Sequence, residues 1–162
     1  MHPNQALIRR FYTAFQARDG EAMGACYHPD AVFSDPAFGE LHGAEIGAMW
    51  TMLTRRATDL VVTFDSVSAD DARGAADWEA RYTFTQTGRP VINRVHAGFA
   101  FRDGLIVRHD DHFAFWRWAR QALGPAGLLL GWTPLIRGKV RSTARASLAA
   151  FQQKGGAKDP AR

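Results

Sequence analysis

Hydrophobic residues follow a helical period in the first third of the chain and a strand period after it. Up to residue 56, apolar residues recur three and four positions apart, which is typical of helices that bury one face. The pattern predicts a helix over 4–17, a short helix after Asp19-Gly20, a short strand over 31–33 and a third helix over 44–56. The first helix carries Leu7, Phe11 and Phe15 on one face.

From residue 59 onward apolar and polar residues alternate. This alternation predicts strands over 59–67, 76–87, 91–101 and 105–116. A turn is expected at Gly88, and Asp103-Gly104 is a strong hairpin signal. Helices followed by a run of antiparallel strands indicate an α+β fold. We expect three N-terminal helices packed on a curved, mostly antiparallel sheet that forms a cone with an apolar pocket over 1–116, followed by a basic helical extension over 117–162.

The extension carries most of the positive charge. The chain has a net charge of +4, yet residues 117–162 contain nine Lys or Arg and a single acid, Asp159. Thr133-Pro134 predicts the start of a helix, and Ile136, Val140 and Phe151 follow at helical spacing. This helix could pack on its own domain or on a dimer mate, lie on a lipid surface, or bind nucleic acid. We expect docking, because the apolar stripe is continuous and the pocket needs a lid. A membrane surface is the less favoured partner, and nucleic acid is not expected because no binding motif is present.

Several classes of protein and site are not expected. The single Cys26 forms no internal disulfide and fits a reducing compartment, so we expect a cytoplasmic protein. No secretory signal or spanning helix is expected. His109 and His112 should face opposite sides of a strand, and the other histidines show no ligand spacing, so neither a metal nor another cofactor is expected.

Two ionisable residues interrupt the apolar face of the last predicted strand, on which Leu105, Val107, Phe113 and Phe115 also lie. His109 and Asp111 lie two positions apart, so they point to the same side of the strand. A buried carboxylate without partners costs several kcal/mol. The pair could lie in water at the sheet edge, form a structural pair in the core, or belong to a ligand or catalytic site. Asp35, in the stretch "AVFSDPAFGELHG", is similarly open: it could build a turn or present a carboxylate at a pocket mouth.

Three stretches carry a resemblance to a known family: "LIRRFYTAFQARDGEAM", "YHPDAVFSDPAFGELHGAEIGAMW" and "FAFRDGLIVRHDDHFAFW". They resemble the nuclear-transport-factor-2-like superfamily, in its branch of ketosteroid isomerases, SnoaL-type polyketide cyclases and limonene-epoxide hydrolases. The resemblance covers residues 5–116. It is specific for the cone-shaped fold and less specific for any one reaction, because the fold hosts enzymes and non-enzymes.

The resemblance also implies roles for single residues. Asp35 matches the general base of the ketosteroid isomerases. Phe11 stands at the position of their oxyanion-binding Tyr, and Ala97 at that of their second, protonated Asp. Asp111 matches the catalytic Asp of the epoxide hydrolases. Arg81 matches their Arg, although the strand period favours a solvated or interfacial Arg81.

We therefore expect an isomerase, cyclase or hydrolase that acts on a small hydrophobic, oxygenated molecule without a cofactor. Asp35 would be the base, with His109 and Asp111 as acid or orienting partners. The alternative is a non-catalytic ligand-binding or dimerisation module of the same fold, and a homodimer is expected. The aromatic residues expected to line the pocket are Phe11, Tyr12, Phe15, Phe38, Trp50, Tyr82, Phe99 and Phe113.

Overall fold

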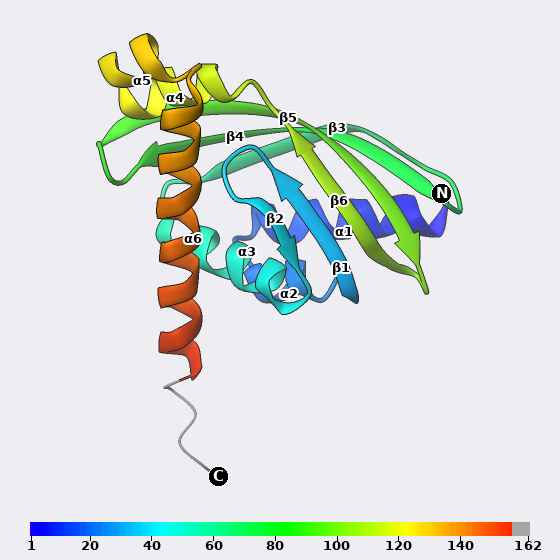
Figure 1. The fold of residues 1–162 in the computed structure, drawn as a ribbon. Helices are drawn as coiled ribbons and strands as arrows, with labels where there is room; N and C mark the ends of the chain where they lie inside the picture. The colour runs from blue at the N-terminus through cyan, green and yellow to red at the C-terminus, as the bar shows by residue number, and fades with distance from the viewer. Residues whose placement is uncertain (157–162) are drawn as a thin grey trace.

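The computed structural model of the chain describes residues 1–156 and shows helices packed against one side of a curved sheet (Figure 1). Three helices come from the first third of the chain, and three more follow the last strand. The helices are α1 (Pro3–Gln16), α2 (Gly20–Gly24), α3 (Ala44–Arg56), α4 (Phe115–Leu123), α5 (Pro125–Leu130) and α6 (Pro134–Gly156). The strands are β1 (Tyr27–Asp35), β2 (Gly39–His42), β3 (Val61–Ala69), β4 (Arg73–Phe84), β5 (Arg89–Arg102) and β6 (Leu105–His112).

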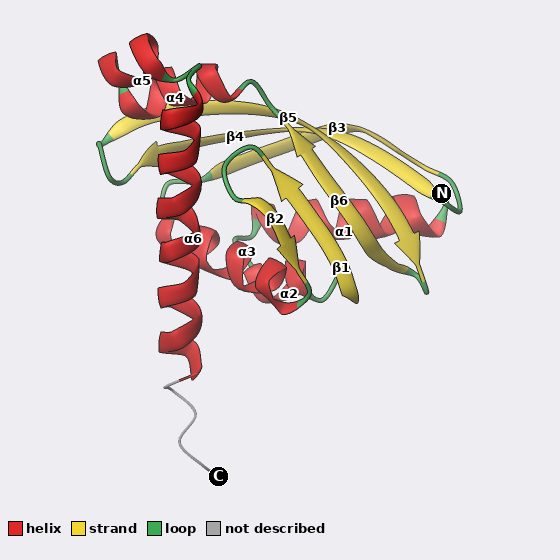
Figure 2. Cartoon of the chain, viewed as in Figure 1, coloured by secondary structure: helices red, strands yellow, loops and turns green. Residues whose placement is uncertain are grey.

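The six strands form one sheet in the order β2-β1-β6-β5-β4-β3 (Figure 2). Every neighbouring pair is antiparallel except β1 and β6, which run parallel. The expected α+β architecture with a mostly antiparallel sheet is therefore confirmed. The parallel pairing matters for function, because it brings the end of β1, with Asp35, beside the end of β6, with Asp111.

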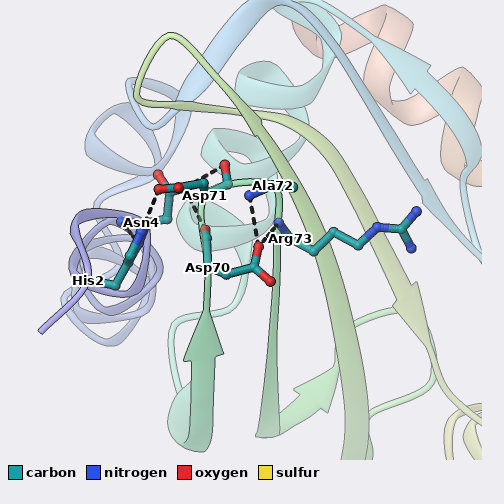
Figure 3. A network of polar contacts seen from close by, with 6 residues as sticks. All are labelled: His2, Asn4, Asp70, Asp71, Ala72 and Arg73. Atoms are coloured by element: carbon teal, nitrogen blue, oxygen red, sulfur yellow. Dashed lines mark hydrogen bonds and ion pairs between the residues drawn. The ribbon is translucent and has the colours of Figure 1, made fainter.

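The N-terminus of α1 is tied to the turn between β3 and β4 by polar contacts (Figure 3). The Asn4 side chain donates to the carbonyl oxygen of Asp70 at 2.9 Å, and the His2 ring lies 2.9 Å from a carboxylate oxygen of Asp71. Asp70 in turn accepts hydrogen bonds from the backbone of Ala72 and Arg73. These contacts fix α1 across the sheet, where its apolar face forms the centre of the core.

The last strand is shorter than its alternating pattern predicts. β6 ends at His112, and α4 begins at Phe115, so the expected strand to residue 116 is wrong. Phe115, Trp118, Ala119 and Ala122 are the buried residues of α4, and their spacing is helical. The four-residue β2 was also not predicted; it is defined by its pairing with β1.

A β-bulge in β6 decides which side chains face the core. Phe101 pairs with Ile106, but the preceding residue Ala100 pairs with Arg108, so Val107 is an extra residue in β6. The sequence alternation placed Val107 on the same face as His109. In the structure Ile106, His109 and Asp111 are buried, because the extra residue shifts the alternation by one position.

The segment after the sheet packs on its own domain. α4 forms a second apolar cluster with Val91, against which Ile136 and Val140 of α6 pack. Farther along α6, Leu148 is buried in the main core. The expected domain boundary at residue 117 falls inside α4. None of the helices in residues 1–156 has the length and apolar character needed to cross a bilayer.

Candidate functional site

An apolar cavity of about 480 Å³ lies between the sheet, α3, α4 and α6. Two carboxylates, those of Asp35 and Asp111, belong to its lining. They come from residues 76 positions apart in the chain and meet because β1 and β6 are neighbours in the sheet. The aromatic part of the lining consists of Phe15, Phe38, Trp50, Trp78, Tyr82, Phe84, Phe113 and Trp118.

Asp35 is both a turn residue and part of the cavity wall. Its Oδ1 accepts hydrogen bonds from the backbone N–H of Ala37 at 2.9 Å and of Phe38 at 2.6 Å, which forms the turn between β1 and β2. Burial raises the pKa of the Asp35 carboxyl to about 7, although the Phe38 N–H opposes the shift. The negative charge of Asp111 raises the pKa further. A carboxyl with this pKa can both accept and release a proton near neutral pH.

His109 and Asp111 form a buried pair within a longer chain of hydrogen bonds. Nε2 of His109 lies 2.8 Å from Oδ1 of Asp111, and Nδ1 of His109 lies 2.6 Å from the Tyr27 hydroxyl. Trp50 Nε1 donates to that hydroxyl at 3.0 Å, and Trp78 Nε1 donates to Oδ1 of Asp111 at 3.4 Å. The pair is therefore buried, both ring nitrogens of His109 have partners, and the pair does not lie in water at the sheet edge.

The direction of each hydrogen bond follows from the donors available. The Tyr27 oxygen accepts from Trp50, and within residues 1–156 Nδ1 of His109 is the one acceptor in contact with the Tyr27 hydroxyl. A neutral imidazole that accepts at Nδ1 carries its proton at Nε2 and donates it to Asp111. Asp111 is thus a hydrogen-bond acceptor whose Oδ1 receives two donors. This arrangement makes His109 an orienting partner of the carboxylate.

Tyr12 contrasts with Tyr27. Among the described residues, its Oη is the one buried side-chain oxygen or nitrogen without a hydrogen-bond partner. Tyr12 packs against Phe64 and Trp78, and burial raises the pKa of its hydroxyl well above the usual value, with a further contribution from the charge of Asp111. Tyr12 is thus held in the core by its ring rather than by its hydroxyl.

The structure separates the expected pocket residues into two sets. Five line the cavity together with Asp35 and Asp111: Phe15, Phe38, Trp50, Tyr82 and Phe113. Phe11, Tyr12, Phe99 and His109 are buried behind that lining, where their rings pack on one another (Phe11–His109 5.5 Å, Phe99–His109 4.4 Å between ring centres). Phe11, Tyr12 and Phe99 were expected in the lining, but they are buried in the core between α1 and the sheet.

Arg81 takes no part in the cavity. Its side chain is exposed and pairs with Glu79 at 2.8 Å. The strand period had favoured this solvated position, since Arg81 alternates with Ala80 and Tyr82, which line the cavity.

Sequence reasoning missed two contributors to the site, Tyr27 and Trp78, whereas the apolar stripe of α6 had been expected to cover the pocket. Trp78 lies on the same face of its strand as Tyr82, so the strand period could have placed it in the cavity lining. Tyr27 precedes His28-Pro29, which had suggested the end of a helix rather than the first residue of β1. From α6, Ile136, Val140 and Ala144 line the cavity.

The two positions at which the resemblance places oxyanion donors carry none here. Phe11 is fully buried against Tyr27 and His109. Ala97 lies directly opposite Asp111 in the β5–β6 ladder. Side chains at such positions are neighbours, with Cβ atoms about 5 Å apart. The neighbouring strand β6 therefore supplies a carboxylate, that of Asp111, on the same face of the sheet as Ala97. Among residues 1–156, no group of three or more acidic, His or Cys side chains has the geometry of a metal site.

Comparisons with solved structures support the same fold. An NTF2-like protein of unknown function from Burkholderia pseudomallei is 22% identical, with a TM-score of 0.64 over 75% of this chain and 98% of that one. A protein from Catenulispora acidiphila with a ketosteroid isomerase-like fold, in complex with trimethylamine, is 18% identical, with a TM-score of 0.64 over 79% and 97%. A candidate polyketide cyclase from Xanthomonas campestris is 22% identical, with a TM-score of 0.59 over 74% and 96%.

Identities this low establish the fold alone, and no curated protein matches the chain in sequence. The model of one family, described as the SnoaL-like domain, matches residues 8–109, which include most of α1, every element from α2 to β5 and most of β6. That span is well over half of the chain, so the protein belongs to the family of SnoaL-like domains.

Proposed function

We propose that this protein is a cofactor-independent enzyme that moves a proton on a small hydrophobic, oxygenated molecule. The reaction belongs to the isomerase, cyclase or hydrolase type, and the chemistry takes place in the apolar cavity. The observation that carries the proposal is the presence of two carboxylates, Asp35 and Asp111, in a wall that is otherwise mainly apolar and aromatic. Structural neighbours that are candidate polyketide cyclases support the same reaction class. The single Cys26 favours a cytoplasmic location.

Asp35 is the proposed base. Its Oδ1 is held by two backbone N–H groups, and no described residue donates to Oδ2. With a pKa of about 7, raised mainly by burial, the carboxylate is a stronger base than an exposed Asp. It would remove a proton from the carbon beside a carbonyl group and return it to another carbon.

Tyr82 is the proposed hydrogen-bond donor to the carbonyl oxygen, where negative charge develops. Its Oη accepts a hydrogen bond from Trp118 Nε1 at 2.8 Å, and no described side chain accepts the Tyr82 proton. Tyr82 lies in the cavity lining, and its pKa is raised mainly by burial, with a smaller contribution from the charge of Asp35. It would supply the donor that Phe11 lacks. Asp111, oriented by His109, would accept a hydrogen bond from a hydroxyl group of the ligand.

Exchange of carbon-bound hydrogen tests the proposal without knowledge of the natural substrate. The bicyclic ketone 2-tetralone, incubated in D2O with the protein, should exchange the hydrogens beside its carbonyl faster than in buffer, as followed by NMR. The rate should rise with pH through about 7, since the base must be ionised. Asp35→Asn should abolish the enhancement, and Tyr82→Phe should reduce it about 10–1,000-fold. Arg81→Gln, outside the cavity, is the matched control and should react like the wild type.

A non-catalytic ligand-binding module is the second candidate. The observation that favours it is the apolar pair Phe11 and Ala97 at the two positions of the expected oxyanion donors. In that case the protein would bind 2-tetralone and related bicyclic ketones without any enhanced exchange. Asp35→Asn would then bind as tightly as the wild type, which calorimetry measures directly. Binding of 2-tetralone by the wild type without enhanced exchange would overturn the proposed chemistry.

A further inference from the structure

The junction of α5 and α6 exposes five large apolar side chains within eight residues. Helix α5 ends with Leu128, Leu129 and Leu130. The segment that follows contains Trp132, just before α6, and Leu135, the second residue of α6. Their exposed fractions are 49%, 68%, 45%, 68% and 75%. Single exposed apolar residues are ordinary, but a contiguous group of this kind marks an interaction surface. We call these five residues the apolar tip; they lie at one end of the molecule, where α5 meets the start of α6 (Figure 1).

The apolar tip is distinct from the face through which α6 packs on its own domain. The inward side of α6 carries Ile136, Val140 and Leu148, which pack on the two core clusters. Leu135, one residue before Ile136, points away from that contact and is the most exposed member of the tip. The segment therefore has two separate apolar faces, and its own domain covers one of them.

Only cations accompany the apolar tip. Residues 112–156 contain seven Lys or Arg and no Asp or Glu. Arg120 lies 5.0 Å from the centre of the Trp116 ring, and Trp116 donates to the carbonyl oxygen of Leu128. Arg137 and Lys139 follow Leu135 on α6. Within the described residues, none of these three cations pairs with a carboxylate.

We propose that the apolar tip and Arg120, Arg137 and Lys139 dock the protein on an anionic lipid surface. Leucine side chains would enter the boundary between headgroups and acyl chains, and Trp132 would lie at headgroup level, where its ring is favoured. The cations would contact anionic headgroups. A second copy of the chain is a poorer occupant. A symmetric dimer through this surface would bring the same cations together, without an acid in residues 112–156 to offset them.

The cavity extends toward the same end of the molecule. Its lining includes Ala126 of α5 and Ile136 and Lys139 of α6, which flank the apolar tip in the sequence. An apolar ligand dissolved in the bilayer would thus have a short path into the cavity. The docking itself is independent of the chemistry proposed for Asp35.

Co-sedimentation of the full chain with vesicles tests the docking. Binding is measured with phosphatidylcholine alone and with 30% phosphatidylglycerol, at low and high salt. The wild type should bind the anionic vesicles at low salt and lose at least about tenfold in affinity at high salt, because salt screens the cations. Leu129→Ser/Trp132→Ser and Arg137→Gln/Lys139→Gln should each weaken binding about tenfold or more.

Matched variants away from the tip separate its role from general effects of charge and apolar surface. Val61→Ser removes an exposed apolar side chain from β3, and Arg9→Gln/Arg10→Gln removes two cations from α1; both should bind like the wild type. Absence of binding to anionic vesicles at low salt would overturn the proposal. So would unchanged binding by Leu129→Ser/Trp132→Ser. A change of that variant from dimer to monomer in analytical ultracentrifugation, without vesicle binding by the wild type, would assign the tip to a second copy.

Discussion

The Tyr27 hydroxyl lies 2.6 Å from Nδ1 of His109, and through this contact the first residue of β1 sets the tautomer of a residue on β6. With Nδ1 as the acceptor, Nε2 of the imidazole donates a hydrogen bond to Asp111. Burial raises the pKa of Tyr27 well above that of a free tyrosine, so the hydroxyl keeps its proton at any physiological pH. The acceptor role of Asp111 therefore depends on a residue that does not line the cavity.

Removal of the Tyr27 hydroxyl should destabilise the fold, whereas removal of the Tyr12 hydroxyl should not. Tyr27→Phe leaves Trp50 Nε1 and Nδ1 of His109 without partners, which costs about 1–3 kcal/mol in free energy of unfolding. Tyr12→Phe deletes a buried hydroxyl that has no partner, so its effect should be neutral or stabilising. Urea denaturation of the two variants measures the difference. Equal losses of stability would contradict the hydrogen-bond chain.

The raised pKa of Asp35 should make the folded protein less stable as the pH rises. Between the unfolded pKa near 3.8 and the folded pKa of about 7, the folded state binds more protons than the unfolded state. The free energy of unfolding therefore falls across this window, by roughly 2–4 kcal/mol for this group. Asp35→Asn keeps an oxygen acceptor for Ala37 and Phe38 without the charge. Its stability relative to the wild type should increase with pH and level off above about 7.

An acid with the opposite shift is the control for Asp35. Hydrogen bonds from Thr83 hold the pKa of Asp59 below its usual value, so this carboxylate stabilises the fold once it is ionised. Asp59→Asn should therefore lose stability relative to the wild type as the pH rises through 4. Chemical denaturation from about pH 2.5 to pH 8 covers the window of both acids and compares both variants. If the free energy of unfolding of Asp35→Asn and of the wild type changes in parallel with pH, the pKa of Asp35 is not raised.

The corner between α4 and α5 requires a residue without a Cβ. A Cβ on Gly127 would lie 1.9 Å from the carbonyl oxygen of Ala119, a backbone atom that cannot turn away. Gly127→Ala should therefore cost about 2–3 kcal/mol in free energy of unfolding. Gly138 is the matched control, since it lies on α6 with nothing within 4 Å of its Cβ position. Gly138→Ala should stabilise by about 0.5–1 kcal/mol, because alanine favours the helix. Thermal unfolding of both variants gives the comparison.

Two leucines of α6 should differ sharply in their contribution to stability. Leu148 is buried in the main core, and Leu135 belongs to the apolar tip. Leu148→Ala should cost about 2–4 kcal/mol through lost burial and the cavity left behind. Leu135→Ala should stay within about 0.5 kcal/mol. A cost below about 1 kcal/mol for Leu148→Ala, measured by urea denaturation, would mean that α6 is not held on the domain as described.

The three N-terminal helices, the start of α6 and most strands could be predicted from the sequence because their periods are regular, whereas α4 and α5 were not predicted. The third helix was predicted over 44–56, the bounds that it has. The phase of β6 could not be predicted in full. His109 and Asp111 were placed on the core face, and they are buried there, but Val107 was placed with them although the bulge removes it. A bulge is set by pairing with the neighbouring strand, and the alternation within one strand contains no record of it.

The composition of the cavity was only partly accessible to sequence reasoning. Asp35 and Asp111 were linked by resemblance, and the parallel pairing of β1 with β6 is what brings them together. That pairing joins segments about 75 residues apart, and local period does not reveal it. The inner face of α6 was recognised as apolar, but the surface it would cover depends on where a helix outside the resemblance docks. The hydroxyl of Tyr27 could not be placed either, because its contact with His109 depends on the pairing of β1 with β6.

The position of α6 has a consequence for how this protein relates to others of its fold. Residues 8–109 match the family, whereas the wall formed by Ile136, Val140 and Ala144 lies outside that match. Asp35 thus lies within the matched framework, while part of the cavity wall comes from a segment outside it. In evolution such a segment can be exchanged or reshaped without disturbing the sheet that holds the carboxylates. The shape of the cavity can therefore change through α6 while the sheet that holds Asp35 and Asp111 stays the same.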